Sequence, residues 1–137
     1  GSEIRMKIPK ILVPIFSGGV HGKGRVDSFQ QIMVGINEDL LEDSYQISKE
    51  ISNEVEERLR KKRFFLGIAS SGGYLATGLS LIEKFSMLQE ILEDVKFKNR
   101  TFVAVDVAAE HLKERGLYML DGKWLSREEF YQSIIDI

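Results

Sequence analysis

The sequence predicts a single-domain α/β protein, and three observations indicate this class. Short apolar runs rich in β-branched residues alternate with longer stretches in which apolar residues recur every three or four positions. The first pattern is typical of strands and the second of amphipathic helices. The chain has 137 residues, of which 43% are hydrophobic, and this suits one domain with its own core. The elements are expected in the order ββα(β)αβα.

Two strands are expected first, "KILVPIF" (10–16) and "FQQIMVGI" (29–36). The stretch that joins them, "FSGGVHGKGR" (16–25), holds four glycines, His21 and two basic residues. Glycines allow a tight turn and a close approach to a ligand, and the cations can pair with phosphate or carboxylate. The stretch lacks the spacing of a P-loop or a Rossmann fingerprint. A ligand-binding loop and a plain hairpin connection both remain open.

Two amphipathic helices are expected at 38–62 and 79–95, because their apolar residues recur at helical spacing among charges. The first helix ends in "RLRKKR", where cations offset the helix dipole. Between the two helices, "FFLGIA" (64–69) predicts a third strand, followed by the loop "SSGGYLATG" (70–78).

The run "TFVAVDVAA" (101–109) is apolar on both alternating faces and predicts a strand covered on both sides. Its charged residue, Asp106, stands near the C-terminal end, where α/β barrels carry their chemistry. A buried acid is costly unless a cation or a donor meets it. We therefore expect Asp106 to be either a metal ligand or a carboxylate held by backbone donors.

The last part of the chain predicts a hairpin or turn around Asp121 and Gly122 in "GLYMLDGKWL". A final helix is expected to open with a capping box formed by Ser126 and Glu129. Trp124 is expected to cover the core.

Composition excludes several classes of function. The net charge of −2 gives no basic field for nucleic acid. The absence of cysteine excludes disulfides and thiolate zinc sites, so any metal must be hard and oxygen-bound. The lack of a long apolar run and of a secretory signal predicts a cytoplasmic protein that binds no membrane. The opening Gly-Ser is typical of an expression tag, so residues 1–6 are expected to be a tag remnant and extension before one domain at 7–137.

Four short motifs occur along the chain in order: "GGVHG", "FQQIMVG", "SSGGYLA" and "VAVDVAAEHLKERGLYMLDGKWLSREEF". In the same order, they resemble four motifs at the start of the barrel domain of enolase (phosphopyruvate hydratase). These family motifs are Gly-Gly-x-His-Ala, Gln-Glu-Phe-Met, Asp-Glu-Gly-Gly-Phe-Ala-Pro and, for the beginning of the last stretch, Leu-Asp-Val-Ala-Ala-Ser-Glu-Phe. The resemblance implies a partial enolase-type, TIM-like barrel, because closing such a barrel takes roughly 250 residues. Open strand edges would then need a homo-oligomer or the remainder of a longer chain.

The resemblance also implies an activity, the Mg²⁺-dependent dehydration of 2-phosphoglycerate to phosphoenolpyruvate, which is a lyase step of glycolysis. By this likeness Mg²⁺ is the implied cofactor and a small phosphorylated acid the implied ligand. His21 matches a histidine that contacts the substrate, and Gly19 and Gln30 fall at substrate-binding positions. Asp106 matches the first carboxylate of the Mg²⁺ site.

Two acids of the resembled motifs are replaced in this chain. The glutamate of Gln-Glu-Phe-Met falls on Gln31, or on Gln30 without an insertion, and Ser71 stands where Asp-Glu ends. Losing a positioned acid or base typically costs about 10² to 10⁴ in rate. The matched segment also ends before the other two Mg²⁺ carboxylates and the lysine base of the family.

Three hypotheses follow. In the first, the chain is an enolase-related domain that does not catalyse alone and serves binding or assembly, or is a piece of a longer protein. In the second, it is a divergent Mg²⁺-dependent lyase completed by missing segments or a partner chain. In the third, it is a small-anion-binding module that uses the glycine-rich loop and the backbone amides of "SSGG" (70–73).

Overall fold

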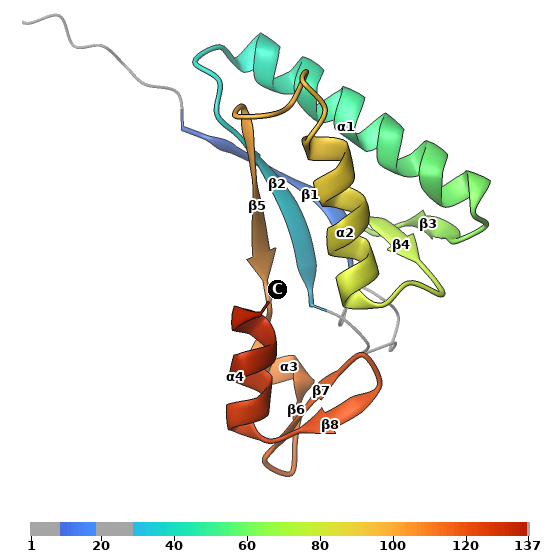
Figure 1. Cartoon of the computed structure of the whole chain (residues 1–137), viewed down its shortest axis with the longest axis vertical. Helices are drawn as coiled ribbons and strands as arrows, with labels where there is room; N and C mark the ends of the chain where they lie inside the picture. The colour runs from blue at the N-terminus through green and yellow to red at the C-terminus, as the bar shows by residue number, and fades with distance from the viewer. Residues whose placement is uncertain (1–8, 19–28, 137) are drawn as a thin grey trace, which may run out of the picture.

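Two helices lie on one side of a mixed β-sheet, and a small unit of strands and short helices follows the sheet (Figure 1). The structure is a computed structural model that describes residues 9–18 and 29–136. Its elements are β1 (Ile11–Ser17), β2 (Gln31–Ile36), α1 (Leu41–Lys61), β3 (Phe65–Ile68), β4 (Tyr74–Ala76), α2 (Leu81–Leu92), β5 (Thr101–Asp106), α3 (Ala109–Leu112), β6 (Lys113–Glu114), β7 (Leu117–Leu120), β8 (Lys123–Leu125) and α4 (Arg127–Ile135). The mixed α/β class expected from the sequence is confirmed.

The larger sheet has five strands in the order β3-β4-β1-β2-β5. Strand β2 is antiparallel to both β1 and β5, whereas β4 is parallel to β1. Strands β1 and β5 therefore run in the same direction. Their C-terminal ends lie at the same end of the sheet as the start of β2. Among the described residues β3 and β5 are the outer strands, so this sheet is open.

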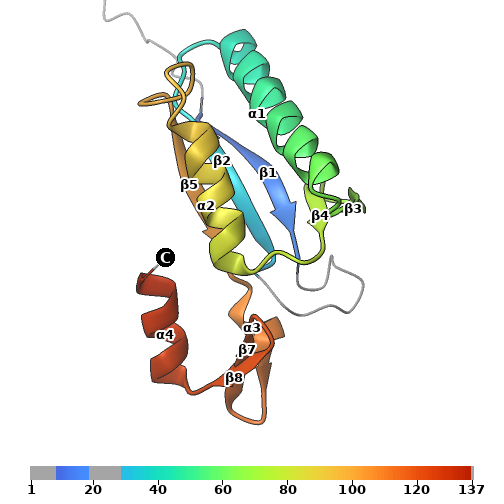
Figure 2. The ribbon, with the colours of Figure 1, turned by 45° about the vertical axis from the view of Figure 1, so that its right-hand side comes forward.

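One face of this sheet is packed against the helices (Figure 2). Alternate residues of β2 (Ile32, Val34 and Ile36) are each about 1% exposed and join a core with Ile51 and Leu88 of the two helices. Side chains alternate across a strand, so the intervening residues of β2 and their register partners lie on the opposite face. We call this the uncovered face, and in β1, β2 and β5 its apolar part comprises Leu12, Pro14, Met33, Gly35, Phe102 and Ala104.

The helices lie close to where their periodicity predicts them. Helix α1 starts three residues later than expected, after Leu40, which provides no side-chain cap. Helix α2 starts after Ser80, whose hydroxyl accepts from the Glu83 amide while the Glu83 carboxylate accepts from the Ser80 amide. This capping box was overlooked in the sequence and sets the start of α2.

Three expectations are wrong in detail, and one short strand was missed. The predicted loop 70–78 contains β4, which pairs with β3, and the short strand β6 was not expected. The strand predicted at 101–109 ends at Asp106, because Ala108 takes up a left-handed conformation with φ of 43° and α3 follows. Strand β5 is also not covered on both sides: Phe102 is 41% exposed on one face and Val103 39% on the other.

The C-terminal unit follows its sequence signals closely. The hairpin of β7 and β8 turns at Asp121 and Gly122, which both have positive φ as the two-residue turn requires. The capping box of Ser126 and Glu129 is confirmed at the start of α4. Trp124, in contrast, is 47% exposed, so it does not cover the core.

A carboxylate ties this unit to the sheet and its helices. The side chain of Asp121 accepts the Leu81 amide at 2.9 Å, at the start of α2. No helix in residues 9–18 and 29–136 is both long and apolar enough to cross a membrane.

Candidate functional site

Three polar residues line up across the sheet where β1 and β5 end and β2 begins. Ser17 is the register partner of Gln31, and Gln31 is the register partner of Asp106. Partners directly opposite each other on antiparallel strands point to the same side and lie close together. These residues, which we call the polar row (Ser17, Gln31 and Asp106), therefore share the uncovered face.

Ser71 joins the polar row from the turn between β3 and β4. Its hydroxyl lies 2.9 Å from the hydroxyl of Ser17. The sequence-predicted positions Gln31, Ser71 and Asp106 thus lie at the same end of the sheet, although they are far apart in the chain. Ser17 was not predicted, because a serine at the end of an apolar run carries little signal by itself.

The turn that carries Ser71 depends on two glycines. Gly72 has φ of +91°, which side chains rarely adopt, and its amide donates to the carbonyl of Ala69 at 2.9 Å. A Cβ at Gly73 would lie 2.3 Å from the hydroxyl oxygen of Ser17. The turn therefore packs directly against the end of β1. Because the Gly72 amide is used within the turn, it does not support the anion-binding hypothesis.

Asp106 is exposed, and its carboxylate oxygen Oδ1 accepts the Ala108 amide at 3.1 Å. Asp side chains commonly hold a backbone amide two residues further along in this way. The observed contact is thus one of the two alternatives expected from the sequence, a carboxylate with a backbone donor. Its exposure removes the desolvation penalty that a buried acid would carry.

The polar row and Ser71 together offer hydrogen-bonding groups and one charge. The two hydroxyls, of which that of Ser17 is buried, and the Gln31 amide donate and accept hydrogen bonds, and Asp106 supplies one carboxylate. Mg²⁺ is usually held by carboxylates together with waters and substrate phosphates, so this donor set does not fit a Mg²⁺ centre by itself. Among residues 9–18 and 29–136 no three His, Cys, Asp or Glu side chains gather where they could hold a metal ion.

The remaining predicted site residues are Gly19, His21 and Gln30. Gly19 and His21 lie outside the described residues. The Gly18 amide donates to the carbonyl of Gln30 at 3.0 Å, so Gln30 is tied to the residue that follows β1, beside the polar row.

Tyr74, from the motif "SSGGYLA", lies on the helix side of the sheet. Its hydroxyl donates to the Ser52 carbonyl and the Glu56 carboxylate, each at 3.1 Å. Burial, followed by the hydrogen bond to Glu56, raises the pKa of Tyr74 to about 12. The hydrogen bond from Arg60 lowers the pKa of Glu56. This cluster joins β4 to α1 and has a structural role.

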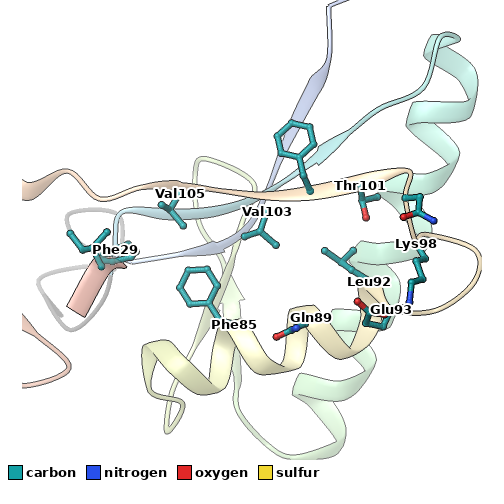
Figure 3. A pocket seen from close by; sticks show the side chains of 12 residues that line it. Phe29, Phe85, Gln89, Leu92, Glu93, Lys98, Thr101, Val103 and Val105 are labelled. Atoms are coloured by element: carbon teal, nitrogen blue, oxygen red, sulfur yellow. Dashed lines mark hydrogen bonds and ion pairs between the residues drawn. The ribbon is translucent and has the colours of Figure 1, made fainter. Parts of the chain in front are cut away.

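A groove of about 630 Å³ runs between α2 and β5 on the helix side (Figure 3). The ring of Phe85 on α2 points toward Val103 of β5. None of the sequence-predicted site residues lines this groove. The polar row and the groove are therefore separate features on opposite faces of the sheet.

No family model matches the chain. Comparison with curated proteins finds similarity to enolases. The chain is 26% identical to the enolase of Sulfurimonas denitrificans over 125 residues, which cover 90% of this chain and 30% of the relative. It is 19% identical to the enolase of Methanocaldococcus jannaschii over 134 residues, covering 94% of this chain and 32% of the relative. The chain thus spans about a third of the length of these relatives.

Proposed function

We propose that this chain is an enolase-related barrel segment that serves binding or assembly and does not itself dehydrate 2-phosphoglycerate. The similarity to enolases along nearly the whole chain supports the relationship. The observation that carries the loss of activity is the composition of the polar row and its neighbour. Gln31 and Ser71, which stand where the resembled motifs have acids, lie with Asp106 at one edge of the sheet.

The physical reason is proton transfer. General acid and base groups work best with a pKa near the working pH, and neither an amide nor a hydroxyl titrates near neutrality. Hydrogen bonds from Gln31 and Ser71 can orient a small phosphorylated acid but cannot remove or return its protons. Of the polar row and Ser71, Asp106 is the side chain that can accept a proton or contribute one ligand to a cation.

The test is an assay of phosphoenolpyruvate absorbance with 2-phosphoglycerate and Mg²⁺. We expect no product above buffer from the 137-residue chain, because Gln31 and Ser71 stand at the acid positions and the resembled lysine base lies outside the matched segment. The enolase of Sulfurimonas denitrificans serves as the positive control. A turnover of about 1 per second, which is an ordinary enzyme rate, would overturn the proposal if it is lost in D106N.

A second candidate is a divergent lyase completed by further segments or a partner chain. The exposed carboxylate of Asp106 at the polar edge favours it, as does the coverage of only about a third of each relative. The intact mass of the native protein discriminates the two. A mass near 15.6 kDa supports the non-catalytic domain, whereas a mass near that of a whole enolase supports the lyase.

A further inference from the structure

We propose that β5 is a self-pairing edge, through which two copies of this chain join their sheets as antiparallel neighbours around a two-fold axis at Val103. The proposal goes beyond the function above, since it concerns the outer edge of β5 and the groove behind it. Three features carry it: the composition of β5, the direction of its free backbone groups, and its charge pattern.

The composition of β5 is that of an interior strand. Thr101–Val105 carries no charge and is apolar on both faces apart from Thr101, a pattern typical of strands with neighbours on all sides. In the part of the chain that the structure describes, β5 pairs with β2 alone. Phe102, Val103 and Val105 are consequently 39–41% exposed. An apolar edge of this kind is a template for pairing with another strand.

The register with β2 fixes which backbone groups face outward. The Asn37 amide donates to the Arg100 carbonyl at 2.8 Å, in line with the register that pairs Ile36 with Thr101. Hydrogen-bonded pairs alternate along an antiparallel ladder, so the even-numbered residues of β5 face β2. The backbone groups of the odd-numbered residues Thr101, Val103 and Val105 therefore point away from β2.

A two-fold pairing centred on Val103 uses all three of these residues in each copy. Each copy keeps its helices on the same side of the joined sheet, because the axis is perpendicular to the sheet. Residues opposite each other would be Val103 with itself, Thr101 with Val105, Phe102 with Ala104, and Arg100 with Asp106.

Charge complementarity favours a second copy as the occupant. Asp106 would face Arg100 of the other copy at both ends of the paired strands, and like charges would not oppose each other along them. The Arg100 side chain is 44% exposed although its Nε pairs with the Glu38 carboxylate and its Nη1 donates to the Lys96 carbonyl at 3.2 Å, so the pairing across the axis would add to these contacts. On the helix side, Val103 and Val105 line the groove between α2 and β5 (Figure 3). In the dimer, the same two residues of the other copy would lie beside this groove and cover its solvent-exposed side.

The first experiment reverses the charges. In D106R arginine opposes arginine, and in R100D aspartate opposes aspartate. We expect each variant alone to have a dimer dissociation constant about tenfold or more above that of the wild type, since two exposed pairs become repulsive. An equimolar mixture of D106R and R100D restores both pairs, so sedimentation of the mixture should show a heterodimer. E38Q is the matched control, because it removes the intrachain partner of Arg100 and should leave the dimer intact.

The second experiment tests the backbone. Val103→Pro removes an amide that faces outward and leaves the amides facing β2 in place, whereas V103T keeps that amide and the β-branched shape. We expect V103P to be monomeric at micromolar concentration with an unchanged circular dichroism spectrum, and V103T to dimerise. A monomeric wild type, a dimer that persists in V103P, or a D106R and R100D mixture that stays monomeric would each overturn the proposal.

Discussion

The two faces of the five-stranded sheet differ in how completely their apolar side chains are removed from water. On the helix face Ile32, Val34 and Ile51 are no more than 1% exposed. On the uncovered face Leu12 is 48% and Phe102 41% exposed, and its rows of side chains end in the polar row. The helices thus supply the burial that holds this fold together, while the other face contributes little burial and carries the candidate chemistry.

The largest test of this comparison replaces a core residue of α1. Ile51→Ala should lower the free energy of unfolding by about 2–5 kcal/mol, because it removes apolar surface and leaves a cavity in a closed core. Leu12→Ala on the uncovered face is the matched control and should cost far less, since nearly half of that side chain is already exposed. Urea denaturation measures both variants. Equal losses would show that the uncovered face is also buried in solution.

A second test places a methyl group at Gly73, in the turn that packs against the end of β1, and at Gly35 on the uncovered face. In Gly73→Ala the new Cβ would meet the Ser17 hydroxyl at 2.3 Å and backbone atoms of β1 at 3.2 Å, so we expect a loss of about 1–3 kcal/mol. In Gly35→Ala the Cβ would meet the tip of the Phe102 ring, which is exposed enough to turn away.

Replacing Gly35 also removes the entropic cost of a strand glycine, about 0.5–1 kcal/mol, so G35A should be close to neutral. Thermal unfolding of the two variants under one buffer gives the comparison. A larger loss in G35A than in G73A would mean that Phe102 is held rigidly over the uncovered face.

The same contrast explains what sequence reasoning found. Helical periodicity placed α1 and α2 well, because their stripes of apolar residues are buried by contacts within the chain. The apolar run of β5 was recognised as a strand too, but the expectation of cover on both sides failed. Apolar residues on both faces indicate that a strand can be buried on both sides. They do not indicate whether the covering elements belong to this chain.

The polar row was only partly predictable. Gln31 and Ser71 were singled out through the enolase resemblance, and Asp106 also through its place near the end of an apolar strand, but no sequence signal placed the three at one end of the sheet. Their meeting depends on strand register and on the turn at Gly72 and Gly73. Ser17 and β4 were overlooked for a similar reason: a single serine and a three-residue strand after two glycines leave too short a pattern to detect.

A third test removes the phenol that links β4 to the helix face. Tyr74→Phe should cost about 1 kcal/mol, since hydrogen bonds to the Ser52 carbonyl and to Glu56 are lost. The folded pKa of Tyr74 is raised from 10.0 to about 12, so the neutral phenol is favoured by folding. Its contribution is therefore complete below pH 10 and is lost as the pH rises toward 12.

The difference in stability between the wild type and Y74F should accordingly shrink between pH 10 and 12. Tyr131→Phe is the control, because the Tyr131 side chain is 52% exposed and removing its hydroxyl should leave the stability nearly unchanged. A difference that stays constant across this range would show that the Tyr74 hydroxyl is not desolvated as described.

The smallest expected effect concerns Mg²⁺ and the polar row. Asp106 is its one carboxylate, and Mg²⁺ keeps its waters unless several oxygens or a phosphate help to displace them. Calorimetric titration of Mg²⁺ into the chain should therefore show weak or no binding, with no difference between wild type and D106N. The asparagine variant is a matched control, because its amide oxygen can still accept the Ala108 amide and preserve the turn. Micromolar affinity that disappears in D106N would show that further oxygens complete the site, and would favour the lyase over the non-catalytic domain.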